Sequence, residues 1–386
     1  ILSILLFAAL LKTRSRIGVY FVLGSGSVIV IGMSLAALGH LYNLEHTFVI
    51  FLSTVVVEII FFSLGLGYRI RESERQKLAA EHEKLVAQEA LNLELSKVNT
   101  AFGRFVPHSF LKALGHESVL DVKLGDSVEK EVTVLFSDIR GYTSIAEKMS
   151  PQENFDFLNA YLGRMGPIIQ QNDGFVNQYY GDGIMALFLN SPSEALRAAE
   201  QMMLELDHYN VDRLSKGRQP IKIGIGLHTG PLMMGVIGDT LRMEAGVVAD
   251  TVNTAARMEG LTKHFQTGII LSEHCVQKLG EGYDTNVRRI GKVKVKGREA
   301  SLIVHESFVA ELDSEQALKR QQKVPFETAL SAYFEQDFPI ATKTFAQVLE
   351  VNPQDRMARH YHALSTQYLL EGAPSDWDGV ERLERK

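Results

Sequence analysis

The chain has 386 residues, a formal net charge of −6 and a single cysteine. This length allows two or three domains, and the slightly acidic balance gives no overall sign of a nucleic-acid-binding protein. One cysteine excludes an internal disulfide and fits a reducing compartment for the soluble part of the chain.

Residues 1–69 are much more apolar than the rest of the chain. Residues 17–39 carry no charge and are long enough to cross a bilayer, which takes about 20 apolar residues. Residues 47–68 form a second stretch of this length, interrupted only by Glu58, and residues 1–11 read as the end of a helix that starts further upstream. The pattern predicts a truncated, multi-pass membrane module.

The charges that flank these stretches predict an orientation. Basic side chains lie between the first two apolar stretches and directly after the third, whereas residues 40–46 contain no Lys or Arg; the basic residues are Lys12, Arg14, Arg16, Arg69, Arg71, Arg75 and Lys77. Because basic loops stay on the cytoplasmic side, we expect an inner-membrane protein whose C-terminal part lies in the cytoplasm.

Residues 70–106 are charged and contain few helix breakers. Apolar side chains follow a four-three spacing near the end of this segment, at Leu91, Leu95, Val98, Phe102 and Phe105. This spacing is typical of a coiled-coil seam, so we expect a parallel, dimeric stalk. Pro107 ends the helix, and residues 107–130 are expected to form a linker.

The main domain is expected over residues 131–310 and begins with a buried strand, EVTVLFS, at 131–137. The strand runs into Asp138, a glycine loop and the start of a helix. Backbone N–H groups at a helix start bind phosphate oxygens, and a carboxylate can hold the cation that neutralises them. The segment therefore predicts a metal–phosphate site.

A predicted hairpin over 175–188 holds a second carboxylate, Asp182, between Gly181 and Gly183. An aspartate between two glycines is also common in an ordinary solvated turn. If the hairpin lies beside the 131–137 strand, however, Asp182 and Asp138 meet at one end of the sheet. Two converging carboxylates would bind two hard cations.

A third segment, DTVNTAAR at 250–257, predicts a helix that Asp250 can cap. Asn253 and Arg257 are four residues apart and share a face of this helix, where an amide and a guanidinium suit a ribose and a triphosphate. The strand at 291–297 carries Lys296 on the same face as two other lysines. That face is either solvated or in contact with phosphate.

The motifs FSDIRGYT (136–143), GDGIMALF (181–188) and DTVNTAAR together closely resemble the class III nucleotidyl cyclases, that is, the adenylyl and guanylyl cyclase catalytic domain. The resemblance covers about residues 131–308. FGRFVP at 102–107 is similar to the short segment that often precedes such domains, and the N-terminal helices resemble the end of a bacterial seven-transmembrane receptor module. The resemblance implies an α/β (α+β, ferredoxin-like) domain that acts as a homodimer.

The resemblance also implies roles for single residues. Two metal ions, Mg²⁺ or Mn²⁺, would be held by two carboxylates and one carbonyl, those of Asp138, Asp182 and Ile139. The triphosphate would lie against the backbone of Ile139, Arg140, Gly141, Tyr142 and Thr143. Residues of the partner subunit would orient the ribose, stabilise the transition state and bind phosphate, and these are Asn253, Arg257 and Lys296. The ribose 3′-hydroxyl would attack the α-phosphate and release pyrophosphate.

The two base-reading positions depart from the family pattern. Gln178 stands where adenylyl cyclases usually have Lys, and Gly246 where they have Asp or Thr; guanylyl cyclases favour Glu and Cys. Gln178 lacks the carboxylate that would accept from guanine, so ATP is favoured, with GTP or relaxed specificity as the alternative. A catalytically silent nucleotide-binding module is a second alternative, against which the four matched site residues argue. A diguanylate cyclase is disfavoured because its GGDEF-type turn is absent.

Residues 325–386 are expected to form a small helical tail that resembles a tetratricopeptide unit. One repeat cannot bury its own apolar face. We therefore expect the tail to pack on the cyclase domain or on its dimer mate, with Trp377 as a buried anchor.

Overall fold

The computed structural model describes residues 16–42, 47–103, 105–295, 301–375 and 377–383. The chain divides into two compact units, residues 1–98 and residues 99–386. Each unit is described below by itself.

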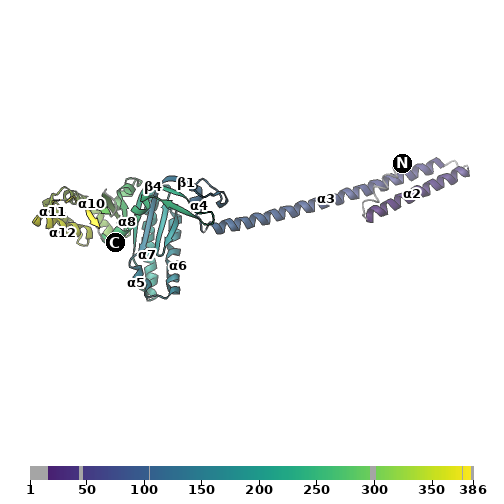
Figure 1. The fold of residues 1–386 in the computed structure, drawn as a ribbon. Helices are drawn as coiled ribbons and strands as arrows, with labels where there is room; N and C mark the ends of the chain where they lie inside the picture. Colours follow the sequence, from purple (N-terminus) through teal and green to yellow (C-terminus); the bar gives the residue numbers. More distant parts are fainter. Residues whose placement is uncertain (1–15, 43–46, 104, 296–300, 376, 384–386) are drawn as a thin grey trace. The chain divides into compact units, whose positions relative to one another are not determined.

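The N-terminal unit is helical and contains α2 (Arg16–Leu41) and most of α3 (Thr47–Phe102). The apolar stretch at 47–68 and the charged stalk are one uninterrupted helix of 56 residues (Figure 1). In the described part of the chain, one helix, Phe48–Phe102, is long and apolar enough to cross a membrane, while the apolar helix Gly26–Leu41 is shorter. The prediction of several membrane spans is therefore not confirmed.

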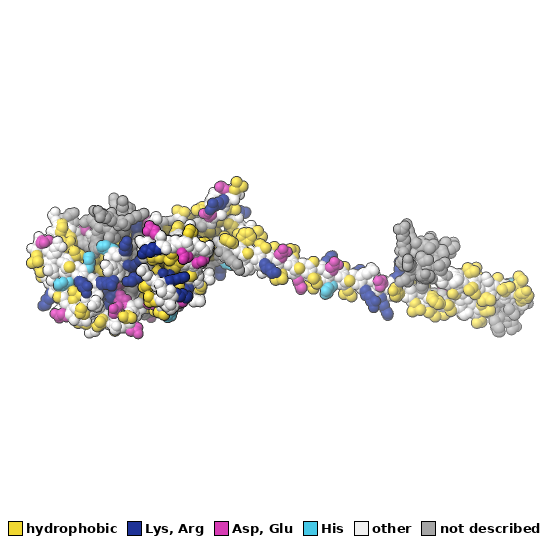
Figure 2. All heavy atoms as spheres, turned by 90° about the horizontal axis from the view of Figure 1, so that it is seen from below, with side chains coloured by type: hydrophobic (Ala, Val, Ile, Leu, Met, Phe, Trp, Pro, Cys, Tyr) yellow, Lys and Arg dark blue, Asp and Glu magenta, His cyan; other side chains and the backbone are white. Residues whose placement is uncertain are grey.

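The predicted coiled-coil seam runs along the second half of α3. Hydrophobic side chains dominate the surface of one part of the helical rod, and Lys, Arg, Asp and Glu side chains appear along the next part (Figure 2). Leu91, Leu95 and Phe102 are each more than half exposed. A coiled coil needs a second chain to cover such side chains, so the dimeric stalk stays a prediction.

The second unit is built on one mixed sheet with the strand order β2-β3-β1-β4-β6-β8-β7-β9, to which β5 adds by pairing with β4. The strands are β1 (Ser127–Ile139), β2 (Gly174–Tyr180), β3 (Gly183–Phe188), β4 (Ile223–Gly238), β5 (Met243–Val248), β6 (Ile269–Ser272), β7 (Val287–Val295), β8 (Leu302–Ser307) and β9 (Glu381–Leu383). The predicted α/β class is confirmed. Strand β1 starts four residues earlier than expected, within the segment predicted to be a linker.

Alternate residues of β1 point to opposite faces of the sheet. Leu135 and Ile139 pack in one buried cluster with α6 (Pro151–Gln171) and α7 (Pro192–Ser215). Val132 and Val134 pack on the other face with α4 (His108–Ala113), and Ala255 of α8 joins the same cluster. Asp138 shares this second face, because it is an even number of residues from Val132.

The remaining helices are α5 (Tyr142–Ala146), α8 (Asp250–His264), α9 (Glu273–Val276), α10 (Asp313–Phe334), α11 (Phe338–Val351) and α12 (Arg356–Glu371). The helical tail expected from residue 325 thus begins at Asp313, and its described part contains the three helices α10, α11 and α12. Figure 1 shows these helices gathered beside the sheet. Their side chains share a buried cluster with α8, β6, β7 and β8.

The tail therefore packs on the sheet of its own chain. This is one of the two arrangements that we expected from the sequence. Trp377 lies in an aromatic cluster, with its ring centroid 5.2 Å from that of Tyr333 and 5.4 Å from that of Phe338. Its expected anchoring role is consistent with these contacts. The likeness to a tetratricopeptide unit stays a prediction.

Candidate active site

The structure brings Asp138 and Asp182 together at one end of the sheet. β1 and β3 are antiparallel neighbours, with Ser137 opposite Ile184. Asp138, which follows Ser137, therefore lies beside the turn that precedes Ile184 and holds Asp182. The turn needs a left-handed backbone at Gly181, whose φ is 66°. The backbone N–H of Ile139 donates a hydrogen bond of 3.1 Å to Oδ2 of Asp182.

The two carboxylates interact unfavourably with each other. Asp182 is buried whereas Asp138 is exposed. Burial, followed by the neighbouring Asp138 carboxyl group, raises the pKa of Asp182 to about 7. A divalent cation would remove this penalty, because it neutralises both charges and replaces lost solvation.

The donor set fits a hard cation such as Mg²⁺ or Mn²⁺. Such ions take carboxylate oxygens and usually keep several waters or substrate oxygens as further ligands. Among the described residues no group of three or more His, Cys, Asp or Glu side chains is arranged to hold a metal. Asp138 and Asp182 would therefore be the side-chain ligands, and the Ile139 carbonyl stays a predicted third.

Glu259 of α8 is a third acidic group close to this pair, and sequence reasoning missed it. Burial, and then the negative charge of Asp138, raise the pKa of Glu259 to about 7, while Arg140 opposes the shift. The residue is two positions after Arg257 in a charged helix, so nothing in its local pattern marks it. Only the packing of α8 on the sheet places it near Asp138.

The loop that follows Asp138 is held by its side chains. The guanidinium of Arg140 donates to the backbone carbonyls of Thr262 and Thr267, at 2.9 and 2.5 Å. The hydroxyl of Tyr142 donates to Oδ1 of Asn154 at 2.9 Å. Nε of Arg140 is buried and makes no hydrogen bond with any of the described residues, and the binding of phosphate by the backbone of residues 139–143 stays a prediction.

Helix α8 crosses β4 in the antiparallel sense. Its backbone approaches so closely that a Cβ at Gly226 would collide with the main chain of α8 at Ala255 and Glu259. Thr262 lies against Gly224, and Thr251 lies against Gly230. Asp138 is the partner of Gly224 in the β1–β4 ladder, so the metal end of the sheet corresponds to the C-terminal end of α8.

Asn253 lies toward the other end of α8 and is exposed. Asn253 lies between Thr251, which is against Gly230, and Ala255, which is against Gly226, and is thus beside the middle of β4. This position is about four residues, or about 13 Å, along the strand from Gly224. A side chain at that distance cannot hold a ribose whose 3′-hydroxyl is at Asp138 and Asp182. Within one chain, the structure does not bring Asn253 together with the two aspartates.

Arg257, one turn further along α8, is half-buried. Its Nη1 atom is buried and makes no hydrogen bond with any of the described residues. A buried guanidinium nitrogen without a partner is costly, and a phosphate group would satisfy it.

Comparisons with known proteins agree with this geometry. Residues 126–306 match the family model described as the adenylate and guanylate cyclase catalytic domain, and this range contains both aspartates and α8. These residues form a class III nucleotidyl cyclase catalytic domain. The expected recognition of the family is therefore confirmed, whereas no finding supports a seven-transmembrane receptor module.

Two curated relatives and one solved structure illustrate the likeness. An adenylate cyclase of Anabaena cylindrica is 40% identical over 219 residues, which cover 55% of this chain and 44% of the relative. Human retinal guanylyl cyclase 2 is 34% identical over 221 residues, 55% of this chain and 19% of the relative. A bacterial light-regulated adenylyl cyclase structure has a TM-score of 0.50 at 22% identity, covering 60% of this chain and 68% of that one, which supports the fold alone.

The two positions predicted to read the base, Gln178 and Gly246, are both on strands. Gln178 is exposed on β2, next to a bulge after Val176. The hydroxyl of Tyr180 donates to Oε1 of Gln178 at 2.8 Å, and the Tyr180 ring stacks on Phe136 with centroids 6.2 Å apart. Sequence reasoning missed Tyr180, although its position two residues after Gln178 in a strand puts both side chains on one face.

Gly246 is on β5, opposite Gly235 of β4. A Cβ at this position would lie 2.5 Å from Cδ1 of Ile237. This atom is the end of a flexible, exposed side chain, which would have to shift to admit a larger residue at 246. Lys296 lies outside the described residues, directly after the end of β7.

Proposed function

We propose that this protein is an adenylate cyclase that converts ATP to 3′,5′-cyclic AMP and pyrophosphate. The observation that carries the proposal is the pairing of Asp138 and Asp182 at the end of the sheet, where burial and proximity raise the pKa of Asp182 to about 7. The 40% identity to a cyanobacterial adenylate cyclase supports ATP as the substrate.

Two Mg²⁺ or Mn²⁺ ions held by Asp138 and Asp182 would acidify the ribose 3′-hydroxyl and stabilise the leaving pyrophosphate. The backbone of residues 139–143 would bind the triphosphate, since its side chains Arg140 and Tyr142 are already engaged. Asn253 would orient the ribose. Arg257 would neutralise charge that develops on the phosphate, and Lys296 would bind phosphate.

We propose a homodimer with composite sites. The separation of Asn253 from the two aspartates within one chain supports this arrangement, because a second chain can supply the missing α8. The exposed apolar seam at Leu91, Leu95 and Phe102 is a second supporting observation, since a parallel coiled coil would hold two catalytic domains together.

We also propose that α3 anchors the protein in a membrane, with the catalytic domain in the cytoplasm. The apolar first part of α3 is followed by Arg69, Arg71, Arg75 and Lys77, which favour the cytoplasmic side. A second span over residues 17–39 and the likeness to a bacterial receptor module stay predictions from sequence.

The deciding experiment is a product assay of the full chain in detergent, with ATP or GTP as substrate and Mg²⁺ or Mn²⁺ as cation. We expect cyclic AMP to be the main product. Formation of cyclic GMP from GTP at higher catalytic efficiency would favour the guanylate alternative. If no cation–nucleotide pair yields a cyclic product while nucleotide still binds, the silent module is the correct description.

A further inference from the structure

Two elements of this domain carry the residues that one protomer would lend to its partner's site. They are α8, with Asn253 and Arg257, and β7, which ends directly before Lys296. Both elements are held by the tail, which we call the C-terminal helices (α10, α11 and α12). The metal-binding pair, by contrast, is on β1 and the β2–β3 turn.

The C-terminal helices bury the end of α8. Met258, Leu261 and Phe265, which follow Asn253 and Arg257 in α8, are all less than 5% exposed and lie in one cluster with side chains of the three tail helices, among them Phe326, Phe345 and Tyr361. Burial of a large apolar side chain contributes about 1.5–3 kcal/mol. The position of α8 on the sheet is thus set from one side by β4 and from another by the tail.

A buried ion cluster joins β7 to α12. The guanidinium of Arg288 is fully buried and donates to both carboxylate oxygens of Asp355, at 2.6 and 2.9 Å. Its Nε donates to Glu306 at 2.7 Å. The same guanidinium lies 4.1 Å from the ring centroid of Phe326 in α10. A bidentate pair of this kind fixes geometry as well as adding energy.

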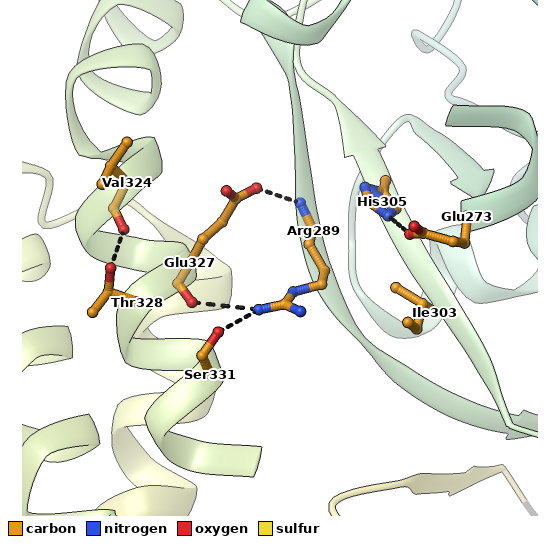
Figure 3. Close-up of a pocket in the computed structure, with 8 residues that line it drawn as sticks. All are labelled: Glu273, Arg289, Ile303, His305, Val324, Glu327, Thr328 and Ser331. Atoms are coloured by element: carbon orange, nitrogen blue, oxygen red, sulfur yellow. Dashed lines mark hydrogen bonds and ion pairs between the residues drawn. The ribbon is translucent and has the colours of Figure 1, made fainter. Parts of the chain in front are cut away.

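Arg289, the residue of β7 that follows Arg288, contacts α10. Its backbone N–H donates to Oε1 of Glu327 at 3.0 Å, and the Arg289 guanidinium donates to the hydroxyl of Ser331 at 2.6 Å. Figure 3 shows these contacts across a pocket of about 470 Å³ between the helix and the sheet. Strand β9 then pairs with the last three residues of β7, Val293 to Val295.

We propose that the C-terminal helices are a positioning element of the catalytic site. They hold α8 in register, so that Asn253 and Arg257 are presented correctly to the partner's metal-bound nucleotide. This inference rests on the proposed composite site. It assigns the tail chiefly to the half of that site that is lent to the partner. The metal-binding half contacts the same end of α8 through Arg140, which donates to the Thr262 carbonyl, so we expect a smaller effect of the tail on that half.

The test uses dimers of two differently substituted chains, in which only one of the two composite sites contains all of its catalytic residues. One chain carries Asp182→Ala and the other carries Arg257→Ala, so each homodimer is inactive. In the mixed dimer, the second chain supplies an intact metal pair and the first chain supplies an intact α8. Recovery of cyclase activity in the mixture establishes the composite site itself. No recovery overturns the composite site, and with it the present inference.

The tail variant Asp355→Asn is then added to either chain of the mixed dimer. On the Asp182→Ala chain, it disturbs the α8 that is in use, and we expect kcat to fall about tenfold to a hundredfold, as for a small misplacement of catalytic groups. On the Arg257→Ala chain the face of α8 that would be lent is not in use, and the change reaches the metal pair through the contact of Arg140 with Thr262, so we expect a clearly smaller fall. Equal effects of both placements would overturn the inference.

A matched control is available in the same tail. Asp337 caps α11 through the N–H of Ile340 just as Asp355 caps α12 through the N–H of Ala358, at 3.1 Å in both cases, but only Asp355 binds Arg288. Asp337→Asn is expected to leave activity unchanged in either chain. If Asp355→Asn prevents folding, the milder variant Glu327→Gln takes its place, and equal effects in its two placements overturn the inference as well.

Discussion

Tyr180 donates a hydrogen bond from its hydroxyl to the side-chain carbonyl of Gln178, over 2.8 Å. A phenol is a better donor than acceptor, and an amide oxygen is the better acceptor, so this pairing orients the amide with its NH₂ group turned away from Tyr180. The stacking of Tyr180 on Phe136 holds the ring in place. Gln178 therefore presents a donor, which suits the acceptor N1 of adenine and not the N1–H of guanine.

Tyr180→Phe is expected to weaken the preference for ATP. Without the hydroxyl, the amide of Gln178 can turn over and offer its oxygen to guanine. A hydrogen bond of about 0.5–1.5 kcal/mol corresponds to a fall of up to about tenfold in the ratio of kcat/KM for ATP to that for GTP. The ratio is measured on the full chain, with Tyr179→Phe as the matched control. An unchanged ratio in Tyr180→Phe would contradict this role.

Asp182→Asn is expected to abolish turnover and yet to stabilise the metal-free catalytic domain. The pKa of Asp182 is raised from 3.8 to about 7, so its ionised form is disfavoured in the folded state; the resulting loss of stability grows as the pH rises above 3.8 and is complete above about pH 7. Asparagine keeps an acceptor for the N–H of Ile139. At pH 8 with a chelator, we expect the melting temperature of the variant to exceed that of the parent by a few degrees.

Excess Mg²⁺ should remove or reverse this difference, because only the parent keeps both metal ligands. Thermal melts with chelator and with Mg²⁺ measure the effect. A variant that is less stable than the parent in chelator would show that the two carboxylates do not repel each other as inferred here.

Arg257→Ala is expected to lower kcat by about a hundredfold to a thousandfold, the usual effect of losing one group that stabilises developing charge. The KM for ATP should change much less, because the contact is made mainly in the transition state. Steady-state kinetics measure both. Arg197→Ala, on α7 and exposed, is the matched control. A large rise in KM with an unchanged kcat would instead assign Arg257 to ground-state binding.

The ion cluster around Glu306 should make the domain sensitive to acid. Burial alone would raise the pKa of Glu306, but the charges of Lys319 and Arg288 outweigh burial and lower it to about 2 from an ordinary value of 4.5. A depressed carboxyl pKa contributes stability that is complete above about pH 4.5 and is lost as the pH falls toward about 2.

Denaturant unfolding at a series of pH values between 6 and 2 tests this behaviour, and Glu306→Gln is the informative variant. It should be less stable than the parent near neutral pH, because Arg288 loses a buried partner, and its stability should depend less on pH below about 4.5. The same acid dependence in parent and variant would assign the effect to other carboxylates.

Local patterns in the sequence were sufficient to predict several of the helices, strands and turns of this protein. Ser150 and Glu153 have the spacing of a capping box, and both of its hydrogen bonds form in the structure. The β2–β3 hairpin and the helix of Asn253 were placed correctly from sequence, but the N-cap residue of that helix is Ala249 and not Asp250, which is its first residue. Such features depend on residues a few positions apart, which is why periodicity and turn residues predict them.

The tertiary structure decided which distant residues meet. Arg288 and Asp355 are 67 positions apart, and Glu259 becomes part of the acidic end of the sheet only because α8 packs across β4. Neither contact can be recognised from a periodic pattern in the sequence, because the packing of whole helices and strands determines which residue pairs with a buried charge. The sequence by itself predicted the cyclase chemistry through four side chains in marked local settings. The fold alone showed that one chain keeps Asn253 apart from the aspartates and that side chains of the tail pack with the end of α8, the helix that carries Asn253.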